Sequence, residues 1–226
     1  MLDIEFGNLQ EPEYGRREAL NSLRTNIQFS GSGLQTLLFT SCQPNEGKST
    51  ISFELAYSMA TNGKKTVFVD ADLRKSVTIN RYKITNQRKR IGGLSHYLSM
   101  QATLDDVLCH TNVENMDIIL SGPYTPNPTA LFNEPAFDVL LQTLRKLYDY
   151  VIIDTPPLGA VIDAAVIAPK CDGAILVLEA NMTNSRAAIS VKKQLELVGS
   201  NILGVVLNKV PVRSSGYYYQ YYGEYK

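Results

Sequence analysis

Short apolar runs alternate along the chain with longer segments in which hydrophobic residues recur at helical spacing. The expected strands cover residues 36–41, 66–70, 116–121, 150–154, 173–178 and 203–208. Several of these runs are hydrophobic at consecutive positions, a pattern typical of parallel strands that helices cover on both faces. The expected helices cover about residues 16–29, 48–62, 104–109, 134–147, 161–168 and 185–198. This alternation predicts an α/β fold with a doubly wound, mainly parallel sheet flanked by helices.

Two segments depart from this alternation. Residues 74–93 are rich in basic side chains and have little apolar periodicity, so we expect a solvated excursion between elements of the sheet. The last residues follow the final strand and hold six of the chain's 13 tyrosines, namely Tyr217, Tyr218, Tyr219, Tyr221, Tyr222 and Tyr225. Because this segment has few aliphatic residues with which to join a core, we expect one domain over residues 1–212 and a flexible tail over residues 213–226.

The charge balance and the cysteines narrow the class of protein. Lys and Arg together number 22, as do Asp and Glu, so no excess of charge favours binding to nucleic acid or to an anionic lipid surface. Cys42, Cys109 and Cys171 are widely spaced and form no CxxC pair, which argues against a disulfide framework or a zinc site. The sequence has no signal-peptide pattern and no run of about 20 apolar residues. We therefore expect a cytoplasmic protein whose contact with a membrane comes through a partner.

Residues 41–50 form a candidate phosphate-binding loop. They follow an apolar strand and open a helix, which is the context of a Walker A motif, although Cys42 stands at the first glycine position of that motif. Gly47 would let backbone amides approach phosphate oxygens at the helix N-terminus. Lys48 would bridge the β- and γ-phosphates, and the Ser49 hydroxyl would ligate Mg²⁺. The other predicted nucleotide contacts in this loop are Pro44, Asn45, Glu46 and Thr50.

Three aspartates at the ends of two expected strands complete the candidate site. Asp154 ends an apolar strand in the Walker B pattern, where its carboxylate can hold Mg²⁺ directly or through water. Asp70 and Asp72 lie at the end of a second apolar strand and would point to the same side if the segment stays extended. One would hold the metal and the other would orient or deprotonate an attacking hydroxyl; the alternative is that they cap the following turn. Because ligands of open α/β folds bind at the carboxyl ends of the strands, we expect all three carboxylates there.

Together these motifs resemble those of the bacterial tyrosine kinases (BY-kinases), which are relatives of the P-loop ATPases MinD and ParA. The resemblance runs from about residue 16 to residue 226 and is greatest with the short members encoded in capsule operons. Besides the three motifs above, it rests on residues 23–28, 121–122, 126–131, 161–165 and 203–209. It implies a P-loop kinase fold.

The resemblance also implies roles for individual residues. Lys48, Ser49 and Thr50 would lie at the phosphates and magnesium, and Asp70 and Asp154 at the metal. Asp72 would be the base toward the incoming tyrosine hydroxyl. Asn208 would contact adenine; the alternative is that Asn208 is a turn residue at the end of a strand.

Members of this family use ATP and Mg²⁺ to phosphorylate their tail tyrosines between molecules of a ring, and they regulate capsular and exopolysaccharide synthesis. The resemblance thus implies self-association, a transmembrane activator of the polysaccharide co-polymerase type that recruits the chain to the inner membrane face, and a cognate tyrosine phosphatase. The assembly motif Glu-x-x-Arg-x-x-Arg matches residues 18–24 except that Asn21 replaces its middle arginine, which leaves the oligomeric state open. Lys75-Ser76 replaces the family's usual Arg/Lys-Pro, so we expect a more flexible loop there.

Other classes of protein fit the sequence less well. An ATPase switch of the MinD/ParA type, without phosphotransfer to protein, remains the main alternative, but that subclass has a lysine early in the P-loop, where Ser41, Cys42 and Gln43 stand. A nucleic-acid-binding module would pair the tail tyrosines with a basic groove, which the tail lacks. A reductase of the nitrogenase type would need cysteine motifs that do not surround Cys109 and Cys171.

Overall fold

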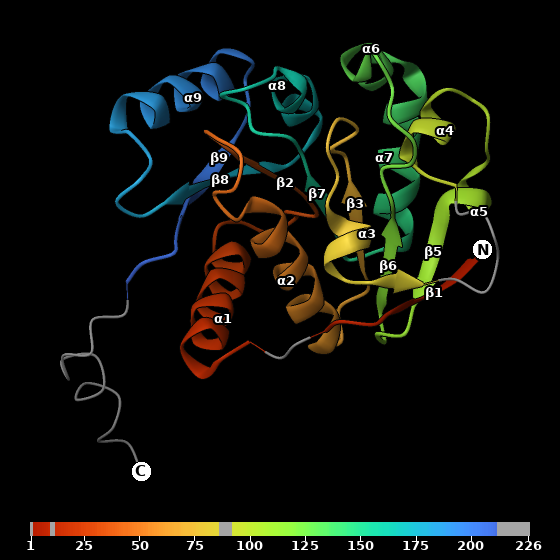
Figure 1. Cartoon of the computed structure of the whole chain (residues 1–226), viewed down its shortest axis with the longest axis horizontal. Coiled ribbons are helices and arrows are strands. Elements are labelled where there is room, and N and C mark those ends of the chain that lie inside the picture. The colour runs from red at the N-terminus through yellow and green to blue at the C-terminus, as the bar shows by residue number, and fades with distance from the viewer. Residues whose placement is uncertain (1, 10–11, 86–91, 212–226) are drawn as a thin grey trace.

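A computed structural model of the chain describes residues 2–9, 12–85 and 92–211, and nine strands within these residues form one sheet (Figure 1). The strands are β1 Leu2–Phe6, β2 Thr36–Ser41, β3 Thr66–Asp70, β4 Ile84–Thr85, β5 Leu108–Thr111, β6 Met116–Ile119, β7 Tyr150–Asp154, β8 Gly173–Glu179 and β9 Ile202–Asn208. The helices are α1 Tyr14–Phe29, α2 Lys48–Thr61, α3 Thr78–Arg81, α4 Leu94–Leu98, α5 Leu104–Val107, α6 Pro128–Asn133, α7 Pro135–Leu147, α8 Asp163–Ile167 and α9 Ser185–Leu197, with a 3₁₀ turn at Ala168–Lys170.

The strand order in the sheet is β4-β1-β5-β6-β3-β7-β2-β8-β9. The central strands are parallel, whereas β5 pairs with β6 and β1 pairs with β4 in the antiparallel sense. The predicted doubly wound, mainly parallel sheet is therefore confirmed. Since β3, β7 and β2 are adjacent and parallel, the loops that follow them meet at one edge of the sheet, where ligands of open α/β folds bind.

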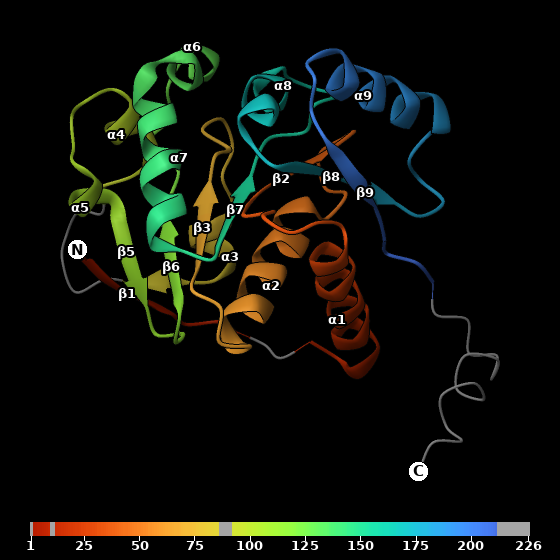
Figure 2. The ribbon, with the colours of Figure 1, turned by 180° about the vertical axis from the view of Figure 1, so that it is seen from behind.

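Helices cover both faces of the sheet, as the continuous apolar strands require. Along β2, Leu37 and Phe39 pack in a core with α1 and α2, while Leu38 packs in a second core with α7, α8 and α9. This alternation follows the two-residue repeat of a strand. Figure 1 shows α1 and α2 over one face, and Figure 2 shows α7 over the other.

Two expectations about secondary structure are wrong. The helix expected over residues 104–109 ends at Val107, because Leu108 and Cys109 enter β5 and pair with β6 and β1. The segment expected to be solvated contains α3 and β4. Within it, Tyr82 is only 8% exposed, because its ring stacks on Phe53 with 3.7 Å between the centroids.

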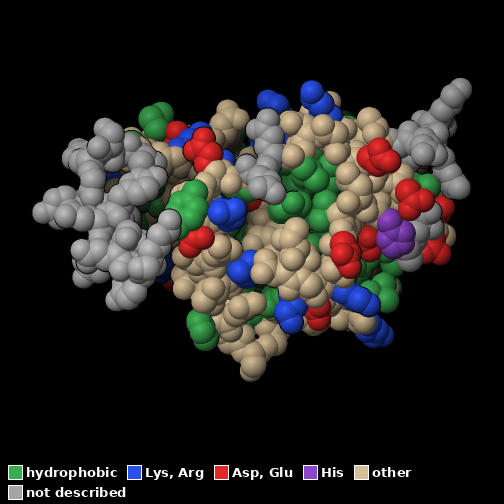
Figure 3. Space-filling view, turned by 90° about the horizontal axis from the view of Figure 1, so that it is seen from below, with side chains coloured by type: hydrophobic (Ala, Val, Ile, Leu, Met, Phe, Trp, Pro, Cys, Tyr) green, Lys and Arg blue, Asp and Glu red, His purple; other side chains and the backbone are tan. Residues whose placement is uncertain are grey.

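Some expectations fall outside the described residues. The tail boundary at residue 212 and the six tail tyrosines belong to this group, as do residues 86–91. Within the described part of the chain, no helix combines the length and the apolar character needed to cross a bilayer. Basic and acidic side chains are interspersed on the face seen in Figure 3, in keeping with their equal numbers in the sequence.

Candidate functional site

The phosphate-binding loop joins β2 to α2 through a left-handed turn. Asn45 has φ 69° and Gly47 has φ 93°, a backbone region that favours glycine. A Cβ atom on Gly47 would lie 2.0 Å from Nδ2 of Asn208, which excludes any larger residue without rearrangement. Gly47 is thus required both by the turn and by the close approach of β9.

Lys48 opens α2 and forms a buried ion pair with Asp154 at the end of β7. Nζ of Lys48 lies 2.8 Å from Oδ1 of Asp154, and the two side chains are 6% and 2% exposed. The ammonium also donates to Oγ of Ser49 at 3.0 Å, and Oγ of Ser52 donates to the same Asp154 oxygen at 3.0 Å. Buried charges persist only when they are paired in this way. The structure therefore brings together Lys48, Ser49 and Asp154, which the two Walker patterns had predicted separately.

Asp70 lies directly beside Asp154, because the register of β3 and β7 pairs these two residues. Burial, and next the neighbouring Asp154 carboxylate, raise the pKa of Asp70 to about 7. Oγ of Ser76 donates to Oδ2 of Asp70 at 2.5 Å. Two adjacent buried carboxylates at the end of the sheet make a site that favours a cation.

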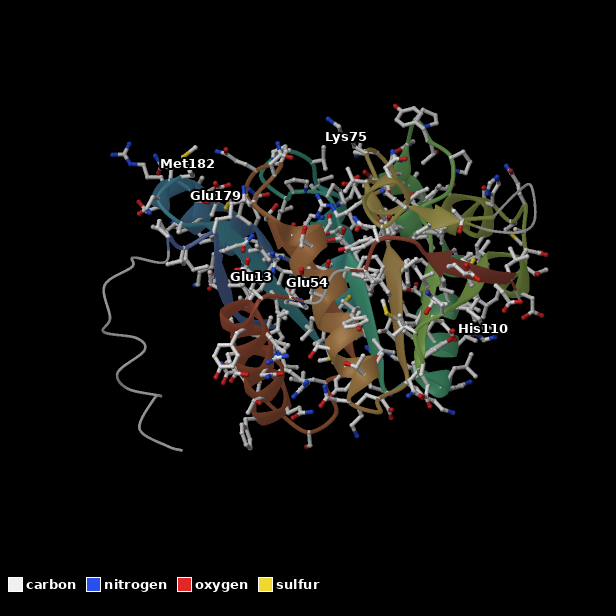
Figure 4. All side chains as sticks on the ribbon, turned by 60° about the horizontal axis from the view of Figure 1, so that its bottom comes forward. Glu13, Glu54, Lys75, His110, Glu179 and Met182 are labelled. Carbon is white, nitrogen blue, oxygen red and sulfur yellow. The ribbon has the colours of Figure 1, made fainter. Side chains whose placement is uncertain are left out.

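Asp72 begins a turn two residues after β3 ends. Its backbone N–H donates to Oδ1 of Asp70 at 3.2 Å, and its own Oδ1 accepts the backbone N–H groups of Arg74 at 3.2 Å and Lys75 at 2.9 Å. Asp72 therefore caps this turn, and its role as a base stays a prediction. Ser76 gives this loop an anchor on Asp70 where the sequence suggested flexibility. Lys75 is exposed at the rim of the molecule in Figure 4.

Glu46 has its carboxylate directed into the phosphate-binding loop. Oε2 accepts the backbone N–H groups of Cys42 at 2.7 Å and Gln43 at 2.8 Å, and Oε1 accepts the hydroxyl of Thr183. The residue is only 4% exposed. The Glu46 side chain therefore organises the start of the loop, where Cys42 replaces the usual glycine. Because both of its carboxylate oxygens are engaged, Glu46 would contact a nucleotide through its backbone.

Asn208, which ends β9, and Lys209, which follows it, hold the other side of the loop. Nδ2 of Asn208 donates to the backbone oxygen of Glu46 at 2.9 Å. Nζ of Lys209 donates to the backbone oxygen of Asn45 and to Oε2 of Glu179, both at 2.7 Å. Glu179 ends β8, on the side of the molecule far from His110 in Figure 4. Asn208 thus contacts the loop backbone, and its contact with adenine stays a prediction.

The site suits magnesium bound together with a nucleotide. The described residues contain no group of three or more His, Cys, Asp and Glu side chains that could hold a metal alone. Asp70, Asp154 and Ser49 offer two carboxylates and a hydroxyl, and Mg²⁺ is typically bound by one or two carboxylates plus phosphate oxygens. The donor set therefore fits the ion that the sequence predicted.

Two contacts at the site were missed by sequence reasoning. Ser52 lies one helical turn after Lys48, so helical spacing alone places it on the same face of α2. Arg74 pairs with Asp163, 89 residues away, and no local pattern indicates such a contact.

Comparison with known proteins places the chain in a family. The sequence model of the AAA domain matches residues 45–202. The chain is 46% identical over 200 residues to "Tyrosine-protein kinase CpsD" of Streptococcus pneumoniae serotype 4, covering 88% of this chain and 87% of that protein. The chain belongs to the bacterial tyrosine-protein kinase family.

The family assignment agrees with solved structures. The chimeric protein CapA2B2 superposes with a TM-score of 0.83 at 32% identity, covering 93% of this chain and 95% of that one. The septum site-determining protein MinD of Pyrococcus horikoshii, solved with Mg-ADP, matches with a TM-score of 0.66 at 23% identity, covering 80% of this chain and 72% of that one. The likeness to MinD shows a common fold alone, whereas the match to the tyrosine-protein kinase CpsD extends over 88% of this chain.

Proposed function

We propose that the chain transfers the γ-phosphate of ATP to tyrosine hydroxyls, including the tail tyrosines 217–219, 221, 222 and 225 of a neighbouring copy. The observation that carries this proposal is the buried Lys48–Asp154 ion pair beside Asp70, with Asp72 two residues further on. The 46% identity to a protein named a tyrosine kinase supports this choice among the P-loop chemistries.

The residues of the site divide the work of the reaction. Lys48 and the loop amides bind and orient the phosphates, and Ser49, Asp70 and Asp154 would hold Mg²⁺, which when bound neutralises charge on the phosphate oxygens. Asp72 aligns the tyrosine hydroxyl and accepts its proton. The bond from the tyrosine oxygen to the γ-phosphorus forms as the bond from that phosphorus to the β,γ-bridging oxygen breaks, and ADP leaves. Most of the acceleration comes from positioning and charge.

The proposal extends to assembly and location. The chain acts with a transmembrane activator of the polysaccharide co-polymerase type, which brings it to the inner face of the cell membrane. Copies of the chain present their tails to one another, a cognate tyrosine phosphatase reverses the modification, and the cycle controls capsular or exopolysaccharide synthesis and export. The similarity to CapA2B2, which was solved as a chimeric protein, supports a search for such a partner.

The second candidate is an ATPase switch of the MinD/ParA type without phosphotransfer to protein. The likeness to MinD is one of fold alone and does not favour this candidate over the kinase. The two candidates differ in the fate of the γ-phosphate, which reaches water in the switch and tyrosine in the kinase.

A mixing experiment tests transfer between copies. Lys48→Met chain with an intact tail is mixed with a wild-type chain truncated after Gly216, and Mg²⁺–ATP is added. We expect phosphate on residues 217–226 of the Lys48→Met chain in the mixture and none in either protein alone. A mixture in which the truncated chain is also Lys48→Met is the control. Labelling of the intact wild type without labelling in the mixture would show transfer within one chain, and ATP hydrolysis without any phosphotyrosine would favour the switch.

A further inference from the structure

A buried carboxylate outside the predicted site is held by an arginine from the loop that carries Asp72. Asp163, the first residue of α8, is fully buried. Its Oδ2 accepts Nε of Arg74 at 2.6 Å, and its Oδ1 accepts Nη2 of Arg74 at 3.0 Å. Oγ1 of Thr129 donates to the same Oδ1 at 2.5 Å. The arrangement is a two-bond arginine–carboxylate pair with a third donor, which fixes direction as well as distance.

This cluster joins three segments at the edge of the sheet. Arg74 follows β3, Thr129 lies in α6, and Asp163 begins α8 nine positions after Asp154 at the end of β7. In both ribbon views the loop after β3 lies between α6 and α8 (Figures 1 and 2). The cluster therefore ties the loop after β3 to α6 and α8.

The backbone of Arg74 is also a direct partner of the Asp72 carboxylate. Oδ1 of Asp72 accepts the N–H of Arg74, and the amide of Asp72 in turn donates to Asp70. An arginine whose side chain is held by Asp163 thus presents one of the two amides that hold the Asp72 carboxylate, and Lys75, the next residue, presents the other. Arg74 is only two positions from the predicted base, Asp72, in the sequence.

We propose that Asp163 and Arg74 form a positioning pair for phosphotransfer. The ion pair between them sets the orientation of Asp72 toward the tyrosine hydroxyl. This inference rests on the proposed kinase function. Neither residue belongs to the nucleotide-binding set formed by Lys48 and the P-loop, so the pair governs the rate of transfer and leaves nucleotide binding unchanged. Thr129 supports the pair by holding one oxygen of Asp163.

The test uses the full chain with Arg74→Lys, because an ammonium cannot make the two parallel bonds of a guanidinium. The acceptor is a synthetic peptide of residues 212–226, and kcat, KM for the peptide and the dissociation constant of Mg²⁺–ATP are measured. We expect kcat to fall about 10- to 100-fold, as for a displaced catalytic group, with nucleotide affinity within about twofold of wild type. Arg145→Lys is the matched control, because Arg145 pairs with Asp172 at 2.8 Å in the same chain.

A second pair of variants separates positioning from folding. Thr129→Val removes one hydrogen bond to Asp163, and Thr129→Ser keeps the hydroxyl, so kcat should fall in the first and recover in the second. An Arg74→Lys chain with unchanged kcat, alongside an inactive Asp72→Asn chain, would overturn the positioning role and leave the kinase function intact. Equal losses of kcat and nucleotide affinity in the Arg74→Lys chain, or the same kcat in Thr129→Ser and Thr129→Val, would also overturn it. A wild-type chain that labels no tyrosine would overturn the kinase function and this inference with it.

Discussion

Lys48 and Asp154 lie 106 residues apart in the sequence, and Nζ of one is 2.8 Å from Oδ1 of the other in the core of the site. Asp70 pairs with Asp154 in the sheet register, so the Lys48 ammonium lies at a place where two buried carboxylates are adjacent. The same ammonium is the predicted ligand of the phosphates. This relationship links the stability of the site to its chemistry, because a change in Lys48 alters both.

Replacing Lys48 with methionine should abolish phosphotransfer and destabilise the fold. We expect the rate to fall by at least about 10²-fold, since a donor to the transferred phosphate is lost. We also expect the free energy of unfolding to fall by about 3 kcal/mol, because Asp154 loses its partner. Phosphotyrosine assays and urea unfolding measure the two effects. Lys170→Met is the control, because Lys170 pairs with the more exposed Asp138 away from the site. An equal loss of stability in Lys170→Met would contradict the claim that the buried Lys48–Asp154 pair stabilises the fold.

Replacing Asp72 with asparagine isolates its chemical role. An asparagine oxygen can still accept the amides of Arg74 and Lys75, so the turn should persist while the proton acceptor is lost. We expect kcat for tyrosine phosphorylation to fall about 10²–10⁴-fold with little change in ATP affinity. Steady-state kinetics and nucleotide titration measure these quantities, with the exposed Asp105→Asn as control. Full autophosphorylation by the Asp72→Asn chain would remove Asp72 from the role of base.

Asp70 should make the stability of the metal-free protein depend on pH. The folded protein holds the pKa of Asp70 at about 7, above the usual value of an unfolded aspartate, so the folded state binds more protons between these two values. The free energy of unfolding should therefore fall as the pH rises through this window. Asp70→Asn should be more stable than wild type at pH 8 by roughly 1–4 kcal/mol, and the difference should shrink toward pH 4.

The measurement is urea unfolding in chelator across that pH range. Asp105→Asn again serves as the control, since its side chain is exposed on α5. A difference between Asp70→Asn and wild type that stays constant from pH 4 to pH 8 would show that Asp70 has an ordinary pKa in the folded protein.

Replacing Glu46 with alanine should loosen the phosphate-binding loop. The change leaves the buried amide of Cys42, the amide of the exposed Gln43 and the hydroxyl of Thr183 without their acceptor. The unsatisfied buried amide of Cys42 costs about 1–3 kcal/mol. We expect a lower melting temperature and weaker binding of Mg²⁺–ATP, measured by thermal unfolding and calorimetry. Glu46→Gln keeps one acceptor oxygen and should lie between alanine and wild type. Nucleotide affinity unchanged in Glu46→Ala would show that this side chain has no part in shaping the loop.

The sequence predicted the parts of this molecule that local pattern determines. The strands Thr36–Ser41, Thr66–Asp70 and Tyr150–Asp154 have the bounds expected from their continuous apolar runs. The residues of the two Walker patterns converge because parallel strands end at a common edge. β1 was not anticipated, because Leu2–Phe6 alternates apolar and charged residues and lacks the continuous apolar run of the predicted strands.

The remaining features depend on contacts between distant segments. Tyr82 is buried because its ring packs on Phe53 of α2, a contact that the basic composition of its own segment does not reveal. Glu46 could be assigned to the loop by position, but its inward direction depends on Thr183, 137 residues further along the chain. The Arg74–Asp163 pair likewise requires the fold before it can be recognised.

The most direct test of the central claim is to incubate the purified chain with Mg²⁺–ATP and measure phosphate on each tyrosine by mass spectrometry. The same incubation is repeated with the cytoplasmic segment of a co-polymerase-type activator fused to the chain. We predict phosphate on tyrosines within residues 217–225, stronger in the fusion, and none in the Lys48→Met chain. ATP hydrolysis that leaves every tyrosine unmodified in both forms would contradict the kinase account and support the ATPase switch.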